Sequence, residues 1–278
     1  MQKLLGLLAL AAALAMPARA DNTAVDYSDL WWNPAHSGWG LGLQRQGDVM
    51  FATLFIYGND GSATWLSASD VRATDAAQTS WSGKLYRTHG NAFTSAFDSS
   101  SVAVSEVGTL RIDFTGAKGG TLTYSVDGAS VVEPIERITF RAPSMAGTYQ
   151  GGMTTESSRC QDEAFNGDFD FAGAMNVALS GSRVAIAFSS ASLSGLTSSC
   201  TFTGDYSQAG RLGSVEGTFK CNLYFSLDPR GENPLFVARL GTFTLGEIAV
   251  TANGFAGKLA AKDQDCTYDG RIGAVRMP

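Results

Sequence analysis

The sequence predicts an all-β protein of two antiparallel meander domains, each closed in a barrel-like way. Apolar residues alternate with small or polar ones in short runs, as in Trp39–Gln44. Turn-forming residues separate these runs, and the chain has 32 glycines but only 17% charged residues. No long stretch after residue 20 repeats apolar residues with the helical period. A β-sandwich stays the alternative, because successive strands can also bury one face by packing as two sheets.

The N-terminal residues 1–20 have the composition of a secretory signal peptide. Lys3 precedes the apolar run Leu4–Met16, and Ala18-Arg19-Ala20 is a small-x-small cleavage site. No later apolar run approaches the roughly 18 residues that a membrane helix needs. We therefore expect an exported protein, periplasmic or extracellular, with no integral membrane segment after the signal is removed.

Residue types divide the remaining chain into two parts. All five tryptophans and both histidines lie before residue 90, and all four cysteines lie after residue 159. Pro143 interrupts strand pairing between them, so the expected domains are residues 21–143 and 144–278. Loss of the signal takes the formal charge from −6 to −8. An acidic chain without a basic stripe does not favour binding to nucleic acid.

Strands joined by short polar turns predict a meander in the first domain. Asn59-Asp60-Gly61 is a hairpin turn, in which glycine adopts a positive φ at low cost. The expected strands cover Trp39–Leu43, Val49–Tyr57, Ser62–Ser69, Ser80–Arg87, Glu106–Thr115, Thr121–Val126 and Val131–Arg141.

The second domain shows the same pattern of short strands and polar turns. Its expected strands cover Gly147–Thr154, Gly167–Phe171, Ala174–Leu179, Val184–Ser189, Ser199–Ser207, Gly213–Cys221, Gly241–Val250, Gly254–Ala261 and Asp265–Val275.

Four cysteines in an exported chain predict two disulfides. A hairpin centred near Ala209–Leu212 places Cys200 opposite Cys221. Cys160 and Cys266 remain; Cys160 lies just after the first strand and Cys266 is at the start of the last one, and these two strands are neighbours in a closed barrel. A metal site is not expected, because the chain has no CxxC pair and no histidine after His89.

Catalytic patterns are sparse, so we expect neither an enzyme nor a cofactor. The chain lacks the nucleophile pattern G-x-S-x-G and a Gly-rich phosphate loop. A secreted hydrolase using His36 or His89 with nearby acids stays an alternative. Two strand-borne carboxylate pairs could bind calcium or act as acid and base, but solvent-facing polar residues are the simpler interpretation. These pairs are Asp168 with Asp170, and Asp263 with Asp265.

The stretch LWWNPAHSGWGLGLQ, residues 30–44, is the strongest candidate site. Trp31 and Trp32 are consecutive, so in a strand they face opposite sides. Trp39 begins an alternating run with Leu41 and Leu43 that should be buried. The Asn33–Pro34 turn should carry His36 to the edge of the domain. The tryptophans either plug one end of a barrel or form a platform for sugars, amines or peptides.

The same stretch resembles a W-W-N-P-x-x-S-G-W-G signature of uncharacterised exported bacterial proteins. Matching segments over residues 29–141 include Gln46–Asp48, Phe51–Phe55, Tyr57, Asp60–Gly61, Trp65–Leu66, Gly83–Thr88 and Gly108–Phe114. The cysteine-bearing half, which ends in Gly270–Gly273, resembles a companion β domain of such proteins. His36 departs from the acidic residue expected at its position. The resemblance implies export and architecture but no chemistry.

The function expected from the sequence is an exported, non-catalytic binding or envelope-associated module. Its partner would be a glycan, a peptide or a small ligand, and its contact surface would be the Trp-rich end of the first domain. A purely structural accessory domain is the further alternative, in which case all tryptophans should be buried. The candidate ligand-binding residues are Trp31, Trp32, His36, Trp39, Tyr57 and Trp65.

Overall fold

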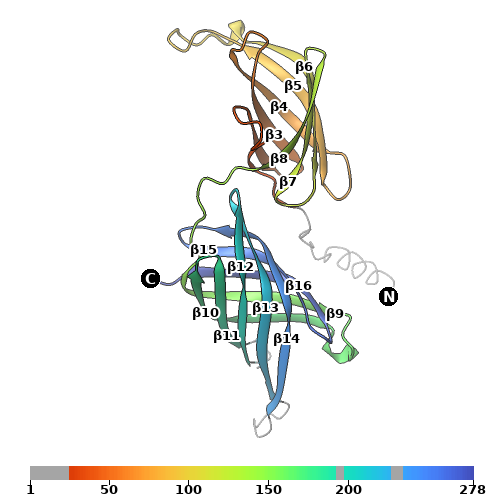
Figure 1. Ribbon diagram of the computed structural model, residues 1–278, viewed down its shortest axis with the longest axis vertical. Coiled ribbons are helices and arrows are strands. Elements are labelled where there is room, and N and C mark those ends of the chain that lie inside the picture. Colours follow the sequence, from red (N-terminus) through yellow and green to blue (C-terminus); the bar gives the residue numbers. More distant parts are fainter. Residues whose placement is uncertain (1–24, 192–196, 227–233) are drawn as a thin grey trace, which may run out of the picture.

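The computed structural model describes residues 25–191, 197–226 and 234–278, and the expected signal peptide at residues 1–20 lies outside them. The chain forms two closed antiparallel barrels of eight strands each, stacked along the long axis of the molecule (Figure 1). Each strand pairs with the next in the chain, and the last strand of each barrel pairs with its first. The barrel prediction is therefore confirmed over the sandwich alternative. None of the helices in the described parts is long and apolar enough to cross a membrane.

The first barrel comprises β1–β8, and a short 3₁₀ helix, η1, precedes β6. Two residue pairs of β1 and β8 close it, Trp31 with Arg137 and Trp32 with Glu136, and beside them the Ile138 amide donates to the Leu30 carbonyl oxygen at 2.8 Å. Its elements are β1 (Asp29–Trp32), β2 (Gly40–Gln46), β3 (Val49–Tyr57), β4 (Ala63–Ala73), β5 (Ser80–His89), η1 (Ser99–Ser101), β6 (Ala103–Phe114), β7 (Gly119–Val126) and β8 (Ala129–Arg137).

The second barrel comprises β9–β16, and its closing ladder runs from Thr267–Ser158 to Arg276–Tyr149. The segment between the barrels, residues 138–146, includes Pro143. The elements are β9 (Gly147–Ser158), η2 (Glu163–Phe165), β10 (Gly167–Ser180), β11 (Arg183–Ala191), β12 (Thr197–Ala209), β13 (Leu212–Ser226), β14 (Pro234–Val250), β15 (Gly254–Lys262) and β16 (Thr267–Arg276).

Two strand predictions in this half were wrong. The segments 167–171 and 174–179 are one strand, β10, because Gly173 pairs with Gly151 on one side and Ser190 on the other. A Cβ atom at Gly173 would lie 2.0 Å from the Ser189 carbonyl oxygen, so this glycine permits close backbone approach and is not a turn. In addition, β14 begins at Pro234, well before the expected Gly241.

Both disulfides join the expected cysteines. Cys200 and Cys221 are directly opposed on β12 and β13, with 4.0 Å between their Cα atoms. Cys160 and Cys266 follow β9 and precede β16, and their Cα atoms are 4.1 Å apart. The second of these bonds ties together the strands that close the barrel.

Large aromatic side chains fill the interior of the first barrel. Trp31 and Trp81 are completely buried there, and Tyr27 stacks on Phe114 with 3.6 Å between ring centroids. The interior of the second barrel contains phenylalanines, methionines and aliphatic residues, including Met175. Two barrels of eight strands each thus enclose cores of different composition.

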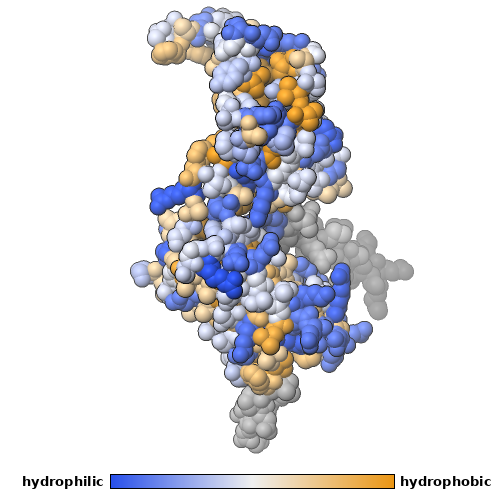
Figure 2. All heavy atoms as spheres, viewed as in Figure 1, coloured by the Kyte–Doolittle hydropathy of each residue, from blue (hydrophilic) through white to orange (hydrophobic). Residues whose placement is uncertain are grey.

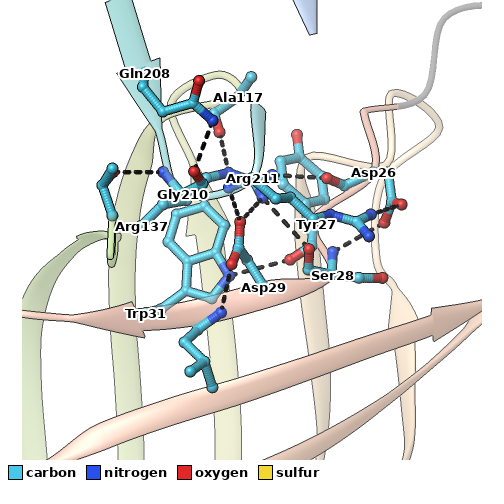
Figure 3. A network of polar contacts seen from close by, with 12 residues as sticks. Asp26, Tyr27, Ser28, Asp29, Trp31, Ala117, Arg137, Gln208, Gly210 and Arg211 are labelled. Atoms are coloured by element: carbon cyan, nitrogen blue, oxygen red, sulfur yellow. Dashed lines mark hydrogen bonds and ion pairs between the residues drawn. The ribbon is translucent and has the colours of Figure 1, made fainter. Parts of the chain in front are cut away.

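The β12–β13 hairpin of the second barrel contacts the rim of the first (Figures 1 and 3). At its tip, the Gly210 amide donates to Thr139 Oγ1 at 2.8 Å, and the Arg211 amide donates to Asp29 Oδ2 at 2.9 Å. The Arg211 side chain also forms an ion pair with Asp26. These bonds connect residues more than 70 positions apart in the chain.

A buried arginine supports this contact from the side of the first barrel (Figure 3). Arg137 donates to Asp29 Oδ2 at 2.8 Å and to the Asp26 carbonyl oxygen at 2.6 Å. Its guanidinium lies over the Trp31 ring, 4.6 Å from the centroid. Burial lowers the pKa of Arg137, while Asp29 opposes that shift. Asp29 therefore accepts hydrogen bonds from both barrels.

Candidate functional site

The two consecutive tryptophans of β1 point in opposite directions, as the strand geometry predicts. Trp31 is completely buried, and its indole N–H donates to the Tyr27 carbonyl oxygen at 3.0 Å. Trp32 points outward and is partly exposed. Only Trp32 of this pair can therefore touch a ligand on the outer surface.

Trp39 differs from the prediction that it shares the buried position of Leu41 and Leu43. Both leucines are fully buried, but Trp39 is only partly buried. It precedes β2, which begins at Gly40, so it lies at the rim of the barrel and neighbouring strands do not enclose it completely. Trp39 packs against the core from this rim.

His36 is exposed at the same rim and faces a carboxylate from β8. Its Nδ1 atom lies 3.0 Å from Glu133 Oε2, and the Asn33 amide donates to the same oxygen at 2.7 Å. Asn33 also forms the expected turn, because its side chain accepts the Ala35 amide and its carbonyl accepts the His36 amide. The hydrogen bond from Asn33 is the main cause that lowers the pKa of Glu133, and His36 adds to it.

This rim gives the hydrolase alternative an acid–histidine pair but no activated nucleophile. Within the described residues, the His36 ring has hydrogen bonds only with Asn33 and Glu133. The described part of the chain shows no side-chain hydrogen bond for His89, which is exposed at the end of β5. A hydrolytic nucleophile must lie within reach of its base, and among residues 25–191, 197–226 and 234–278 no hydroxyl group forms a hydrogen bond with either histidine.

Aromatic side chains gather on the outer face of β3 and β4. Phe55 and Trp65 are directly opposed across the two strands, and Trp65 is 53% exposed. Tyr57, at 60%, is two residues along β3 from Phe55. Gly38 lies beside Tyr57, since a Cβ atom there would be 3.6 Å from the tyrosine ring. We call Phe55, Tyr57 and Trp65 the outer aromatic face.

Small hydroxyl side chains lie next to these aromatic residues. Thr53 pairs with Ser67 across β3 and β4, one row from the Phe55–Trp65 pair. On either side of this row are Gly42 on β2 and Tyr86 on β5. Thr53, Phe55, Trp65 and Ser67 are uncharged, and the first charged side chain along the Thr53–Ser67 row is that of Glu106, which pairs with Tyr86. Figure 2 shows hydrophobic side chains among hydrophilic ones on the surface of this barrel.

The structure thus separates the candidate residues into three groups. Trp32, Tyr57 and Trp65 point outward, Trp31 and Trp39 belong to the core and its rim, and His36 contacts Glu133. Sequence reasoning missed Phe55. Strand β3, VMFATLFIY, has apolar residues on both faces. Since one face of a barrel strand lines the core, the apolar residues of the other face could have indicated an exposed aromatic surface.

The carboxylate pairs also separate. Asp168 and Asp170 are exposed, as the simpler interpretation predicts, but Asp263 is buried, which corrects that interpretation. Asp263 accepts the backbone amides of Asp265 and Cys266 at 2.8 and 2.6 Å. The described residues include no group of three or more His, Cys, Asp or Glu side chains that could hold a metal ion.

Comparisons with known proteins give no family. No family model matches the chain, and neither does any curated protein. Among solved structures, the chain is similar to the isotype 1 transferrin binding protein B from serogroup B Neisseria meningitidis, with 10% identity and a TM-score of 0.31. The match covers 87% of this chain, which spans only 66% of that protein. At this TM-score and identity, the similarity carries no argument about function, which must come from the residues of the two barrels.

Proposed function

We propose that this protein is an exported, non-catalytic binding module that holds a neutral glycan on the outer aromatic face of its first barrel. One observation carries the proposal: three large aromatic side chains, Phe55, Tyr57 and Trp65, are each more than half exposed on neighbouring strands. Single exposed apolar residues are common on soluble proteins, whereas contiguous ones mark contact surfaces.

The chemistry of this face favours a carbohydrate over a charged partner. Aromatic rings offer flat apolar surfaces against which the C–H faces of a sugar can stack. Thr53 and Ser67 place hydroxyl groups next to those rings, where they can exchange hydrogen bonds with sugar hydroxyls. Because Thr53, Phe55, Trp65 and Ser67 are uncharged, a charged ligand placed on them would lose hydration without a direct ionic partner.

A structural accessory role predicts that every tryptophan is buried. Trp65 is 53% exposed, which does not fit that role. An experiment distinguishes the hydrolase alternative from a binding module. If the protein cleaves a bound glycan and a His36→Ala variant does not, the non-catalytic proposal is wrong.

The test is a screen of the full exported chain against neutral oligosaccharides, followed by titration calorimetry on the best binder. Trp65→Ala and Phe55→Ala should each weaken binding by about tenfold or more, as expected for central aromatic contacts. Phe93→Ala is the matched control, because Phe93 is 99% exposed but lies in the β5–β6 connection and not on β3 or β4.

Two results would reject the proposal. One is the absence of any glycan binder in the screen. The other is equal binding by the Trp65→Ala and Phe93→Ala variants, which would place the glycan elsewhere on the molecule.

A further inference from the structure

The second barrel contains a cavity of about 90 Å³ at the end away from the first barrel. Residues from the starts of β10, β12, β14 and β16 line it, whereas the β12–β13 turn that contacts the first barrel lies at the opposite end. A single buried water needs only about 10–15 Å³ of such space. The cavity therefore has room for a small organic group.

Most of the cavity wall is apolar. Phe169, Phe171, Phe202 and Phe219 line it, together with the Cys200–Cys221 disulfide. The small side chains of Ser198 and Ala261 leave the space between them open. An eight-stranded barrel is just wide enough to be filled by its own side chains or to hold one small ligand. At this end of the second barrel, the lining side chains leave room for one small ligand.

The polar groups of the wall already have partners within the protein. Arg239 forms an ion pair with Asp265, and its Nη1 atom is 3.6 Å from Asp263. Asp263 accepts the Tyr268 hydroxyl at 2.9 Å, and burial raises the pKa of Tyr268, so this hydroxyl stays a donor. Across the described residues, no buried side-chain nitrogen or oxygen lacks a hydrogen-bond partner.

This pairing defines which ligand the cavity can take. The two aspartates already offset the charge of Arg239, so a carboxylate entering the cavity would gain no net attraction. An ammonium group would lose its water and find no unpaired acceptor, because Asp263 already accepts several hydrogen bonds. An uncharged ring or short aliphatic group loses little hydration and gains contact with the phenylalanines.

We infer that the interior of the second barrel is a binding site for an uncharged apolar group about the size of one ring. The site is separate from the outer aromatic face, and it does not depend on the glycan proposal. The cavity is on the second barrel and the outer aromatic face is on the first, so each can fail in an experiment without the other.

The test uses the full chain and three ligands with the same ring but different charge: benzyl alcohol, benzoate and benzylammonium. Binding is followed by NMR of ¹³C-labelled methionine methyl groups. Met153 lines the cavity, and Met50 in the core of the first barrel is the internal control. Benzyl alcohol should shift the Met153 signal only, with an affinity about tenfold or more above that of either charged ligand.

A matched pair of variants on β15 locates the site. Ala261 faces the cavity, whereas its neighbour Ala260 is exposed on the outside of the barrel. Ala261→Phe should reduce affinity for benzyl alcohol by about tenfold or more, because the new ring occupies the space, and Ala260→Phe should leave it unchanged. If Ala261→Phe does not fold, Val237→Phe fills the same cavity from β14.

Three outcomes would overturn the inference. The first is the absence of any Met153 shift with benzyl alcohol. The second is equal or tighter binding of benzoate or benzylammonium, which would reject the uncharged class of ligand. The third is unchanged binding in a folded cavity-filling variant, which would place the ligand elsewhere.

Discussion

The two barrels have the same number of strands and the same connectivity, but they fill their interiors differently. Both expose an aromatic pair outside, Phe55 with Trp65 on the first and Tyr224 with Phe236 on the second, but the first fills its interior with large aromatic residues: Tyr27, Trp31, Trp81 and Phe114. The second leaves a cavity of about 90 Å³ inside. Strand number and tilt set the width of a barrel, whereas side-chain volume decides whether that width is filled.

The barrels also differ in how they are closed. Two residue pairs close the first barrel, and the buried Arg137 supports that seam through Asp29. Ten residue pairs and the Cys160–Cys266 bond close the second. A cavity removes packing contacts from a core, and a long closing ladder with a covalent bond can offset that loss. The following predictions test this comparison.

Reduction of the disulfides should have the largest effect, and only on the second barrel. In the chain-entropy account, the bonds spanning 106 and 21 residues contribute about 5 and about 3 kcal/mol respectively. All five tryptophans are in the first barrel, so their fluorescence should report its unfolding alone, while far-ultraviolet circular dichroism reports both. An equal loss of stability in the first barrel on reduction would show that the barrels unfold as one unit.

Removal of a core tryptophan should affect the first barrel almost as strongly. Trp31→Ala should destabilise it by about 3–5 kcal/mol, as for other large buried aromatics. Trp39→Ala should cost only about 1–2 kcal/mol, because Trp39 keeps part of its surface in water. Chemical denaturation followed by fluorescence measures both variants. Equal losses would mean that the rim is packed as tightly as the interior.

Enlarging an inward alanine should have opposite effects in the two barrels. Ala68→Leu enters the filled first core and should destabilise it by about 1–3 kcal/mol. Ala261→Leu adds apolar contact inside the cavity and should be neutral or stabilise the second barrel by up to about 1 kcal/mol. Thermal unfolding of each variant measures the change in stability. Destabilisation of both would show that the cavity lining cannot accept extra volume.

The hairpin contact between the barrels should depend on Gly210. Gly210 has a φ of +57°, and a Cβ atom there would lie 2.2 Å from Asp29 Oδ2. Gly181 has a φ of +62° with nothing within 4 Å of its Cβ position, so Gly181→Ala should cost only the backbone strain of about 1–2 kcal/mol. Gly210→Ala should cost more and should speed amide hydrogen exchange at Arg211. Equal exchange in both variants would argue against the contact.

The smallest effect is a pH dependence at the His36 rim. Hydrogen bonding from Asn33 lowers the pKa of Glu133 from its ordinary value of 4.5. The stability that this bond contributes is therefore present above the unfolded pKa and is lost as pH falls through the folded pKa. Carboxyl NMR titration should show a larger upward shift of the Glu133 pKa in Asn33→Ala than in His36→Ala. A larger shift in His36→Ala would make the ion pair the dominant cause.

Local sequence patterns predicted much of this architecture. Alternation and glycine-containing turns predicted antiparallel meanders, and hairpin symmetry placed Cys200 opposite Cys221. The same period-two pattern predicted that Trp31 and Trp32 face opposite sides of β1. These features depend on neighbours in the chain or on strands joined by one turn, so their residues are encoded close together.

The contacts that build the sites join residues far apart in the chain. Local sequence patterns do not show which of these residues meet. His36 meets Glu133 because barrel closure brings β8 beside β1, and Arg239 of β14 meets Asp263 because Asp263 directly follows the neighbouring strand β15. The sequence also supplied the exposed Phe55 and the small Ala261 without showing their surroundings. Only closure of each sheet fixes which side chains fill its interior, which stay outside, and where a cavity is left.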